Sequence, residues 1–99
     1  MIKERVCPIL IAGKFCEANY NETFQAYNPA TSEKLPEIYP VSEWADLEKA
    51  LEASHRVRLE LARCHPDKIA AFFDLYADLL EKNRESIVRQ ANLETALPV

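Results

Sequence analysis

Residues 66–97 carry the strongest pattern in the sequence, and they limit what the rest of the chain can fold into. Apolar or small residues recur there in steps of three and four, which places them on one face of a helix. They are Ile69, Phe72, Phe73, Tyr76, Leu79, Leu80, Ile87 and Ala91. Asp74, Asp78, Glu81 and Lys82 fall mostly on the other face. Burying one Phe or Leu side chain contributes roughly 1.5–3 kcal/mol, so this face needs an apolar partner.

A second amphipathic segment precedes this one. Its apolar or small residues have the same spacing, at Trp44, Leu47, Leu51, Ser54, Val57 and Leu61. We predict helix one over residues 42–64, with Ser42 as its N-cap. We predict helix two over residues 66–97, because proline suits the first helical position. Helix two could break near Asn83, which would then cap a third helix.

The region before residue 42 is predicted to form β-structure. Residues 1–8 form a lead-in, and residues 9–41 form a hairpin and an extended connector. Residues 9–18 and 23–27 alternate as strands do, and a polar turn cluster at 19–22 separates them. We therefore predict that these two strands pair as an antiparallel hairpin, which alone is marginally stable in water.

The connector begins with a second turn at Asn28-Pro29, followed by small polar residues. Residues 35–41 contain Pro36 and Pro40, which cannot donate to a strand ladder, so this stretch is an edge strand or an extended connector. The predicted fold class is α+β: an N-terminal antiparallel hairpin followed by two or three amphipathic helices. The 99 residues amount to one partial domain at most.

Composition excludes several classes of function. Gly13 is the one glycine of the chain, so neither a P-loop nor a dinucleotide-binding fingerprint can be present. A net charge of −4 argues against a nucleic-acid partner. No stretch approaches the roughly 20 apolar residues of a membrane helix, and no signal peptide is visible. Three cysteines without CxxC spacing fit free thiols in the cytoplasm.

The residues offer no reaction centre of their own. Cys64 and His65 are adjacent and diverge, so a metal site is disfavoured, and a solvated or capping histidine is the simpler interpretation. Cysteine nucleophiles need a base and an orienting group, for which no local motif exists. The carboxylates of helix one indicate its solvated face: Glu43, Asp46, Glu48, Glu52 and Glu60. Trp44 and the Phe72-Phe73 pair are interpreted as core.

Four motifs in order carry a family resemblance. They are IAGKF at residues 11–15, NPAT at 28–31, ADLLEKNRE at 77–85 and LETALP at 93–98. Together they resemble the N-terminal segment of the NAD(P)-dependent aldehyde dehydrogenase superfamily. The chain departs from the family at Ser32 and at Ala96, where the family often has glycine. The LETALP form is similar to the branch of ketoglutarate semialdehyde and NADP-preferring fatty aldehyde dehydrogenases.

The resemblance implies that this chain is the opening part of an α/β (Rossmann-like) cofactor-binding domain. The family's catalytic cysteine, general-base glutamate and cofactor loop lie further along its chain and have no counterpart here. NAD or NADP is expected to bind the full-length parent, and no cofactor is expected to bind this chain alone. The implied partners are the remainder of the dehydrogenase polypeptide or other subunits, with no nucleic acid and no membrane.

The resemblance also implies a cation site. Several family members bind a monovalent cation through backbone carbonyls and a carboxylate, which here would be Ala26, Tyr27 and Glu94. An ordinary surface or capping carboxylate is the favoured interpretation of Glu94. Oxygen ligands suit a hard cation. The leading hypothesis is a dehydrogenase fragment that is not catalytic alone. The alternative is a small, self-contained interaction module without enzymatic activity.

Overall fold

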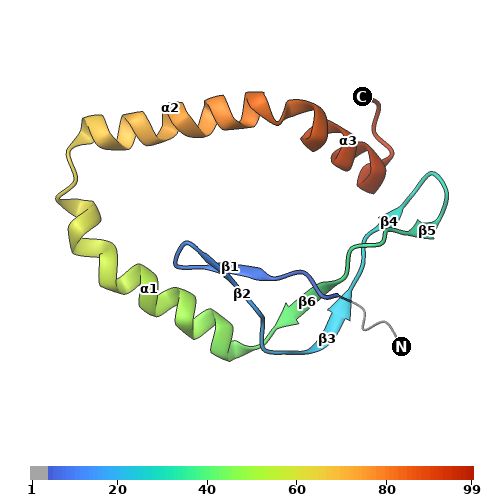
Figure 1. Cartoon of the computed structure of the whole chain (residues 1–99), viewed down its shortest axis with the longest axis horizontal. Coiled ribbons are helices and arrows are strands. Elements are labelled where there is room, and N and C mark those ends of the chain that lie inside the picture. Colours follow the sequence, from blue (N-terminus) through green and yellow to red (C-terminus); the bar gives the residue numbers. More distant parts are fainter. Residues whose placement is uncertain (1–4) are drawn as a thin grey trace. The chain divides into compact units, whose positions relative to one another are not determined.

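A computed structural model describes residues 5–99, which form β-strand pairs followed by three helices (Figure 1). The α+β class is therefore confirmed. Chain contacts divide the molecule into two compact units. The first contains the described residues up to Ala26 together with Lys34–Arg58, and the second contains Tyr27–Glu33 and Leu59–Val99.

The first hairpin lies inside the stretch predicted as a single strand. Strand β1 (Ile9–Ile11) pairs antiparallel with β2 (Lys14–Cys16), with Leu10 opposite Phe15. Ala12 and Gly13 form the turn, and both have positive φ, at 51° and 76°. Two consecutive residues with positive φ match the right-handed twist of short hairpins. The predicted pairing of residues 9–18 with 23–27 is therefore wrong.

The second strand pair joins distant parts of the sequence. Strand β3 (Tyr20–Phe24) pairs antiparallel with β6 (Tyr39–Ser42), with an irregularity between Tyr20 and Glu22. The rings of Phe24 and Tyr39 lie 5.4 Å apart. The polar cluster at residues 19–22, predicted as a turn, is thus largely strand, since strand pairing is decided by partners that local propensity does not include.

A short pair of strands lies between β3 and β6 in the sequence. Strand β4 (Tyr27–Asn28) is next to β5 (Glu33–Lys34), and the turn predicted at Asn28-Pro29 connects them. The Asn28 side chain accepts a hydrogen bond from the Ala30 N–H at 3.0 Å. Ser32 ends the turn with φ 59°, in the left-handed region that glycine occupies without strain.

Helix α1 (Trp44–Ala62) is followed by α2 (Pro66–Lys82) and α3 (Arg84–Thr95). Helix α2 begins with Pro66 at its N-terminus, and the His65 side chain accepts a hydrogen bond from the Asp67 N–H at 3.1 Å. The predicted helix over residues 66–97 does break near Asn83, as the sequence analysis allowed. The Asn83 side chain donates to the Leu79 carbonyl at 2.8 Å, so it terminates α2. In the second unit, α3 lies against β4.

Helix α3 ends at a residue with unusual backbone geometry. Ala96 has φ 58° and ψ 15°, and its N–H donates to the Asn92 carbonyl at 2.8 Å. This is the left-handed cap in which glycine is usual. Both positions at which the sequence departs from the resembled family's glycines, Ser32 and Ala96, are therefore left-handed.

Residues 5–99 contain no buried hydrophobic side chain. The single buried residue among them is Asp46, which is 4% exposed. Within the same part of the chain, no helix combines the length and apolar character needed to cross a membrane. The local elements are therefore well formed, but they do not enclose a hydrophobic core.

Candidate functional site

The most extensive chemical feature is one face of α2, which we call the α2 apolar face. It consists of Ile69, Phe72, Phe73, Tyr76, Leu79 and Leu80, all of them exposed. Phe72 is 60% exposed and Phe73 62% exposed. The Phe72 ring meets Phe73 edge-on at a centroid distance of 5.5 Å and stacks near Tyr76 at 6.3 Å. These are the favourable ring geometries, so the face presents a pre-arranged aromatic cluster.

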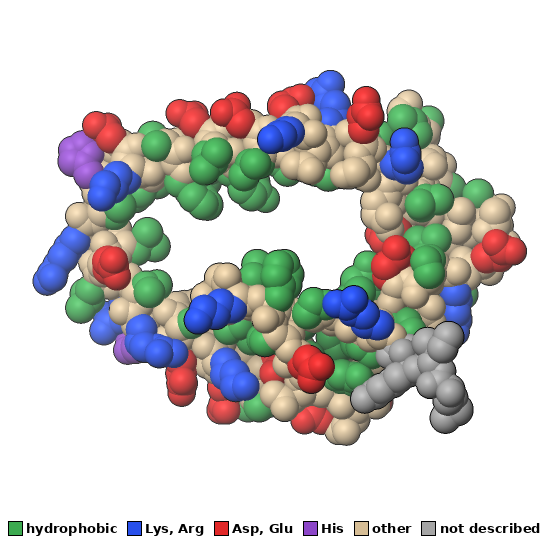
Figure 2. Space-filling view, in the orientation of Figure 1, with side chains coloured by type: hydrophobic (Ala, Val, Ile, Leu, Met, Phe, Trp, Pro, Cys, Tyr) green, Lys and Arg blue, Asp and Glu red, His purple; other side chains and the backbone are tan. Residues whose placement is uncertain are grey.

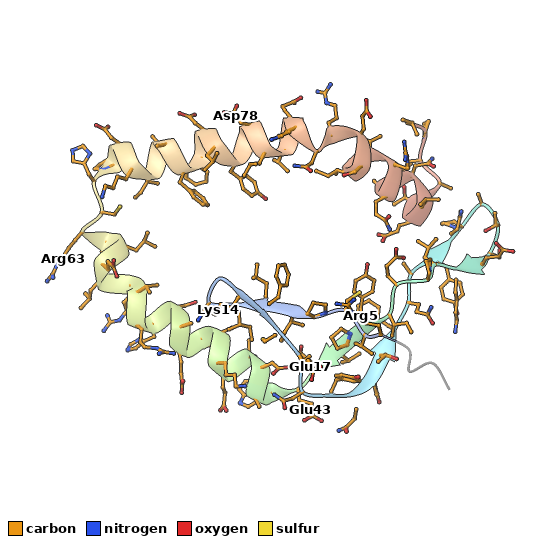
Figure 3. All side chains as sticks on the ribbon, viewed as in Figure 1. Arg5, Lys14, Glu17, Glu43, Arg63 and Asp78 are labelled. Carbon is orange, nitrogen blue, oxygen red and sulfur yellow. The ribbon has the colours of Figure 1, made fainter. Side chains whose placement is uncertain are left out.

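The opposite side of α2 is charged. Its carboxylates are Asp67, Asp74, Asp78 and Glu81. Figure 2 shows hydrophobic side chains along one side of α2 and charged side chains along the other. Figure 3 shows Asp78 on the side opposite to the aromatic rings. This separation of apolar and charged residues is typical of a helix that covers an apolar surface with one side and meets water with the other.

Helix α1 also carries exposed apolar residues in the first unit. Trp44, Leu47 and Leu51 are all exposed and are spaced as one helical stripe. The Trp44 indole N–H donates to the Glu48 carboxylate at 2.9 Å. The prediction that Trp44 and the Phe72-Phe73 pair are core is therefore wrong for the described chain, in which all three are on the surface.

Asp46 anchors the start of α1 to the strand region of its own unit. Its carboxylate accepts hydrogen bonds from the Asn19 N–H at 2.9 Å and from the Asn19 side-chain amide at 2.8 Å. The Asn19 carbonyl accepts the Glu43 N–H at 2.8 Å, and the Asn21 amide donates to the Glu43 carboxylate. Asn19 and Asn21 thus fix the residues before β3 and within it against the first turn of α1.

The ionisation of Asp46 follows from these contacts. Burial alone would raise its pKa, but hydrogen bonds from the Asn19 side chain and backbone, then Ser42, and the charge of Lys49 lower the pKa below its ordinary value. The sequence analysis placed Asp46 on the solvated face of helix one, which is wrong. The sequence did contain a signal: Asn19, Asn21 and Ser42, which carry side-chain amides or a hydroxyl, lie in or beside β3 and the start of α1. No spacing rule, however, links Asn19 to Asp46.

The residues predicted as a cation site lie in both units. The Ala26 carbonyl accepts a hydrogen bond from the Leu35 N–H at 2.8 Å, which leaves one lone pair for another donor or ion. Tyr27 is in β4 and Glu94 is in α3, two elements that contact each other. The Glu94 carboxylate accepts a hydrogen bond from the Gln90 amide at 3.0 Å. The cation site remains a prediction.

The cysteines and histidines do not assemble into a site. Cys7 and Cys64 are half-buried, and Cys16 is exposed. His65 caps α2, as the simpler of the two interpretations expected. Across residues 5–99, no group of three or more His, Cys, Asp or Glu side chains is arranged to hold a metal ion.

The described residues contain no glycine-bearing turn that opens a helix. Gly13 lies in a hairpin turn and is followed by strand β2. A dinucleotide phosphate instead requires a glycine-bearing turn that opens a helix.

Comparison with known proteins gives a distant similarity to dehydrogenases. The chain is 32% identical over 89 residues to a protein named "Putative aldehyde dehydrogenase" from Staphylococcus aureus strain MSSA476. The same identity and length hold for strain USA300, and the protein of the bovine strain RF122 / ET3-1 is 30% identical. The match covers 90% of this chain and 18% of each relative, so it spans a small part of their length.

Two other comparisons gave nothing. No protein-family profile matches the sequence. No solved structure matches it either. The similarity to aldehyde dehydrogenases thus depends on the curated relatives, and it does not distinguish one branch of the superfamily from another.

Proposed function

We propose that this chain is an N-terminal scaffold part of an NAD(P)-dependent aldehyde dehydrogenase of the cytoplasm and is not catalytic alone. The complete enzyme would oxidise an aldehyde to a carboxylic acid, with water supplying the oxygen and NAD or NADP taking the hydride. The observation that carries the proposal is the alignment, which runs through 90% of this chain but 18% of the relatives. The absence of a buried apolar side chain in residues 5–99 supports it, because a scaffold part is completed by the rest of its domain.

Within this proposal, the chain is the first portion of the Rossmann-like cofactor-binding domain. The ketoglutarate semialdehyde or NADP-preferring fatty aldehyde branch is our finer proposal, and it rests on the LETALP form at residues 93–98. Ala26, Tyr27 and Glu94 would contribute to a monovalent cation site that other parts of the enzyme complete.

A chimera tests the proposal. Residues 1–99 replace the matching 89-residue segment of the S. aureus MSSA476 relative, and the product is assayed for aldehyde oxidation with NAD and with NADP. The unaltered relative is the positive control, and the purified 99-residue chain is assayed beside it. We expect turnover by the chimera and none by the chain alone. An inactive chimera beside an active relative would refute the proposal, and so would cysteine-dependent turnover by the chain alone.

A self-contained interaction module is the second candidate. The Asn19–Asp46 hydrogen bonds favour it, because they hold residues 27 positions apart in the sequence within one unit. A concentration-independent monomer with a single cooperative melt would support the module over the dehydrogenase fragment.

A further inference from the structure

We propose that the α2 apolar face is the surface on which the rest of a dehydrogenase polypeptide docks, through a broad, uncharged, apolar surface. The docking polypeptide corresponds to the portion of the S. aureus relatives outside the 89 aligned residues. This inference rests on the proposed function and adds the residues that make the contact and the chemistry of the surface they meet.

The separation of charge on α2 defines the partner's chemistry. Asp67, Asp74 and Asp78 are exposed, as are Phe72 and Phe73. The helical spacing places these carboxylates on the side of the helix opposite to the rings, and Figure 3 shows this for Asp78. Burying an unpaired charge is costly, whereas burying aromatic rings is favourable. The partner surface must therefore be apolar where it meets the rings, and it needs no basic groups there.

The width of the apolar arc indicates a broad partner. At 3.6 residues per turn, the α2 apolar face spans about 120° of the helix circumference from Leu79 through Ile69 to Phe73, and the exposed Leu75 beside it extends the apolar arc to about 160°. A stripe of about 100° is enough for a helix resting on one surface. An occupant that contacts Leu75 and Phe73 together must partly enclose the helix, which a single docked peptide would not do.

The length of the relatives favours a larger partner over a second copy. The match covers 18% of each relative, so most of a relative's polypeptide lies outside it. Trp44 and Leu47 on α1 are also exposed. Two copies paired through α2 would leave these α1 residues exposed, whereas a polypeptide with the remaining length of the relatives is large enough to cover both helices.

Cysteine labelling in the chimera tests the docking. Phe72→Cys reports on the α2 apolar face, and Asp78→Cys is the matched control on the charged side of the same helix. Each variant is made in the free 99-residue chain and in the chimera. Maleimide modification is followed by peptide mass, which distinguishes labelling of the introduced cysteine from labelling of Cys7, Cys16 and Cys64. Tyr76→Cys is the second reporter in case Phe72→Cys prevents folding of the chimera.

We expect Phe72→Cys and Asp78→Cys to react at similar rates in the free chain. In the chimera, Phe72→Cys should react at least about tenfold more slowly, because modification then requires local opening, while Asp78→Cys should be unchanged. Slow labelling of Phe72→Cys in the free chain, whether from closure of the chain on itself or from pairing of copies, would overturn the docking.

The two proposals fail in different ways. An active chimera in which Phe72→Cys and Tyr76→Cys both react at the free-chain rate would overturn the docking and leave the proposed function intact. A soluble, inactive chimera with protected reporters would overturn the function and uphold the docking. An insoluble chimera beside a soluble relative would overturn both.

Discussion

Replacing Ala96 with glycine should stabilise the end of α3. Ala96 has φ 58° and ψ 15°, and the left-handed conformation costs about 1–2 kcal/mol for a residue with a Cβ. Glycine removes that cost but loses about 0.5–1 kcal/mol more than alanine in conformational entropy. The net gain should be about 0.5–1 kcal/mol.

The N–H of residue 96 provides a direct assay. In the native chain it donates to the Asn92 carbonyl at 2.8 Å, so its exchange with solvent reports opening of this cap. A gain of about 0.5–1 kcal/mol corresponds to an exchange rate about two- to fivefold slower after correction for the intrinsic rate of glycine. Hydrogen exchange followed by NMR on the 99-residue chain measures this locally and does not require a cooperative melt.

Ala91→Gly is the matched control, since Ala91 is an exposed residue inside α3. There glycine should destabilise the helix by about 1 kcal/mol, and the exchange of nearby amides should become faster. The reasoning is refuted if Ala96→Gly leaves exchange unchanged or makes it faster. It is also refuted if both variants shift exchange in the same direction, because the backbone at residue 96 would then not be left-handed.

Three other outcomes test separate parts of the structure. The N–H of residue 32 donates to the Asn28 carbonyl at 2.7 Å. Because Ser32 also has positive φ, Ser32→Gly should slow the exchange of this N–H by about two- to fivefold. Unchanged exchange would contradict this. The lowered pKa of Asp46 means that its contribution to stability is present above pH 3.8 and is lost as pH falls below that value. An NMR titration of the Asn19 amide should therefore show a step below pH 3.8 that Asp46→Asn removes, and a step above pH 3.8 would be inconsistent with the hydrogen bonds. In the chimera, Glu94→Gln should weaken sodium or potassium binding measured by calorimetry, and equal binding by both forms would eliminate Glu94 as a ligand.

Features governed by local signals were predictable from the sequence. Proline at the first position located the start of α2, and Asn83 was identified as a possible break that would cap a third helix. The break exists, but the Asn83 side chain bonds to the end of α2 and makes no cap hydrogen bond to α3. The turn at Asn28 followed from the same local chemistry. Each of these features depends on contacts within about five residues, so the sequence pattern contains the information.

Features governed by distant partners were not predictable. One miss was local: residues 9–18 were predicted as one strand because periodicity does not reveal the tight turn at Ala12 and Gly13. The pairing of β3 with β6 depends on residues on both sides of the β4–β5 turn. Asp46 has the helical spacing of a solvated residue, yet Asn19 buries it. In the last two cases the deciding contact links segments whose separation no short-range pattern specifies.

The hydrogen bonds that set the local geometry cannot stabilise the whole chain. Ordering one residue's backbone costs about 1–2 kcal/mol, whereas one hydrogen bond contributes a net 0.5–1.5 kcal/mol. Apolar burial supplies the difference in ordinary domains, but no hydrophobic side chain among residues 5–99 is buried. Under the docking proposal, the missing stabilisation comes from contacts of exposed faces such as the α2 apolar face. For this reason a cap change such as Ala96→Gly should act locally in the free chain, whereas a change at Phe72 should affect the stability of the chimera.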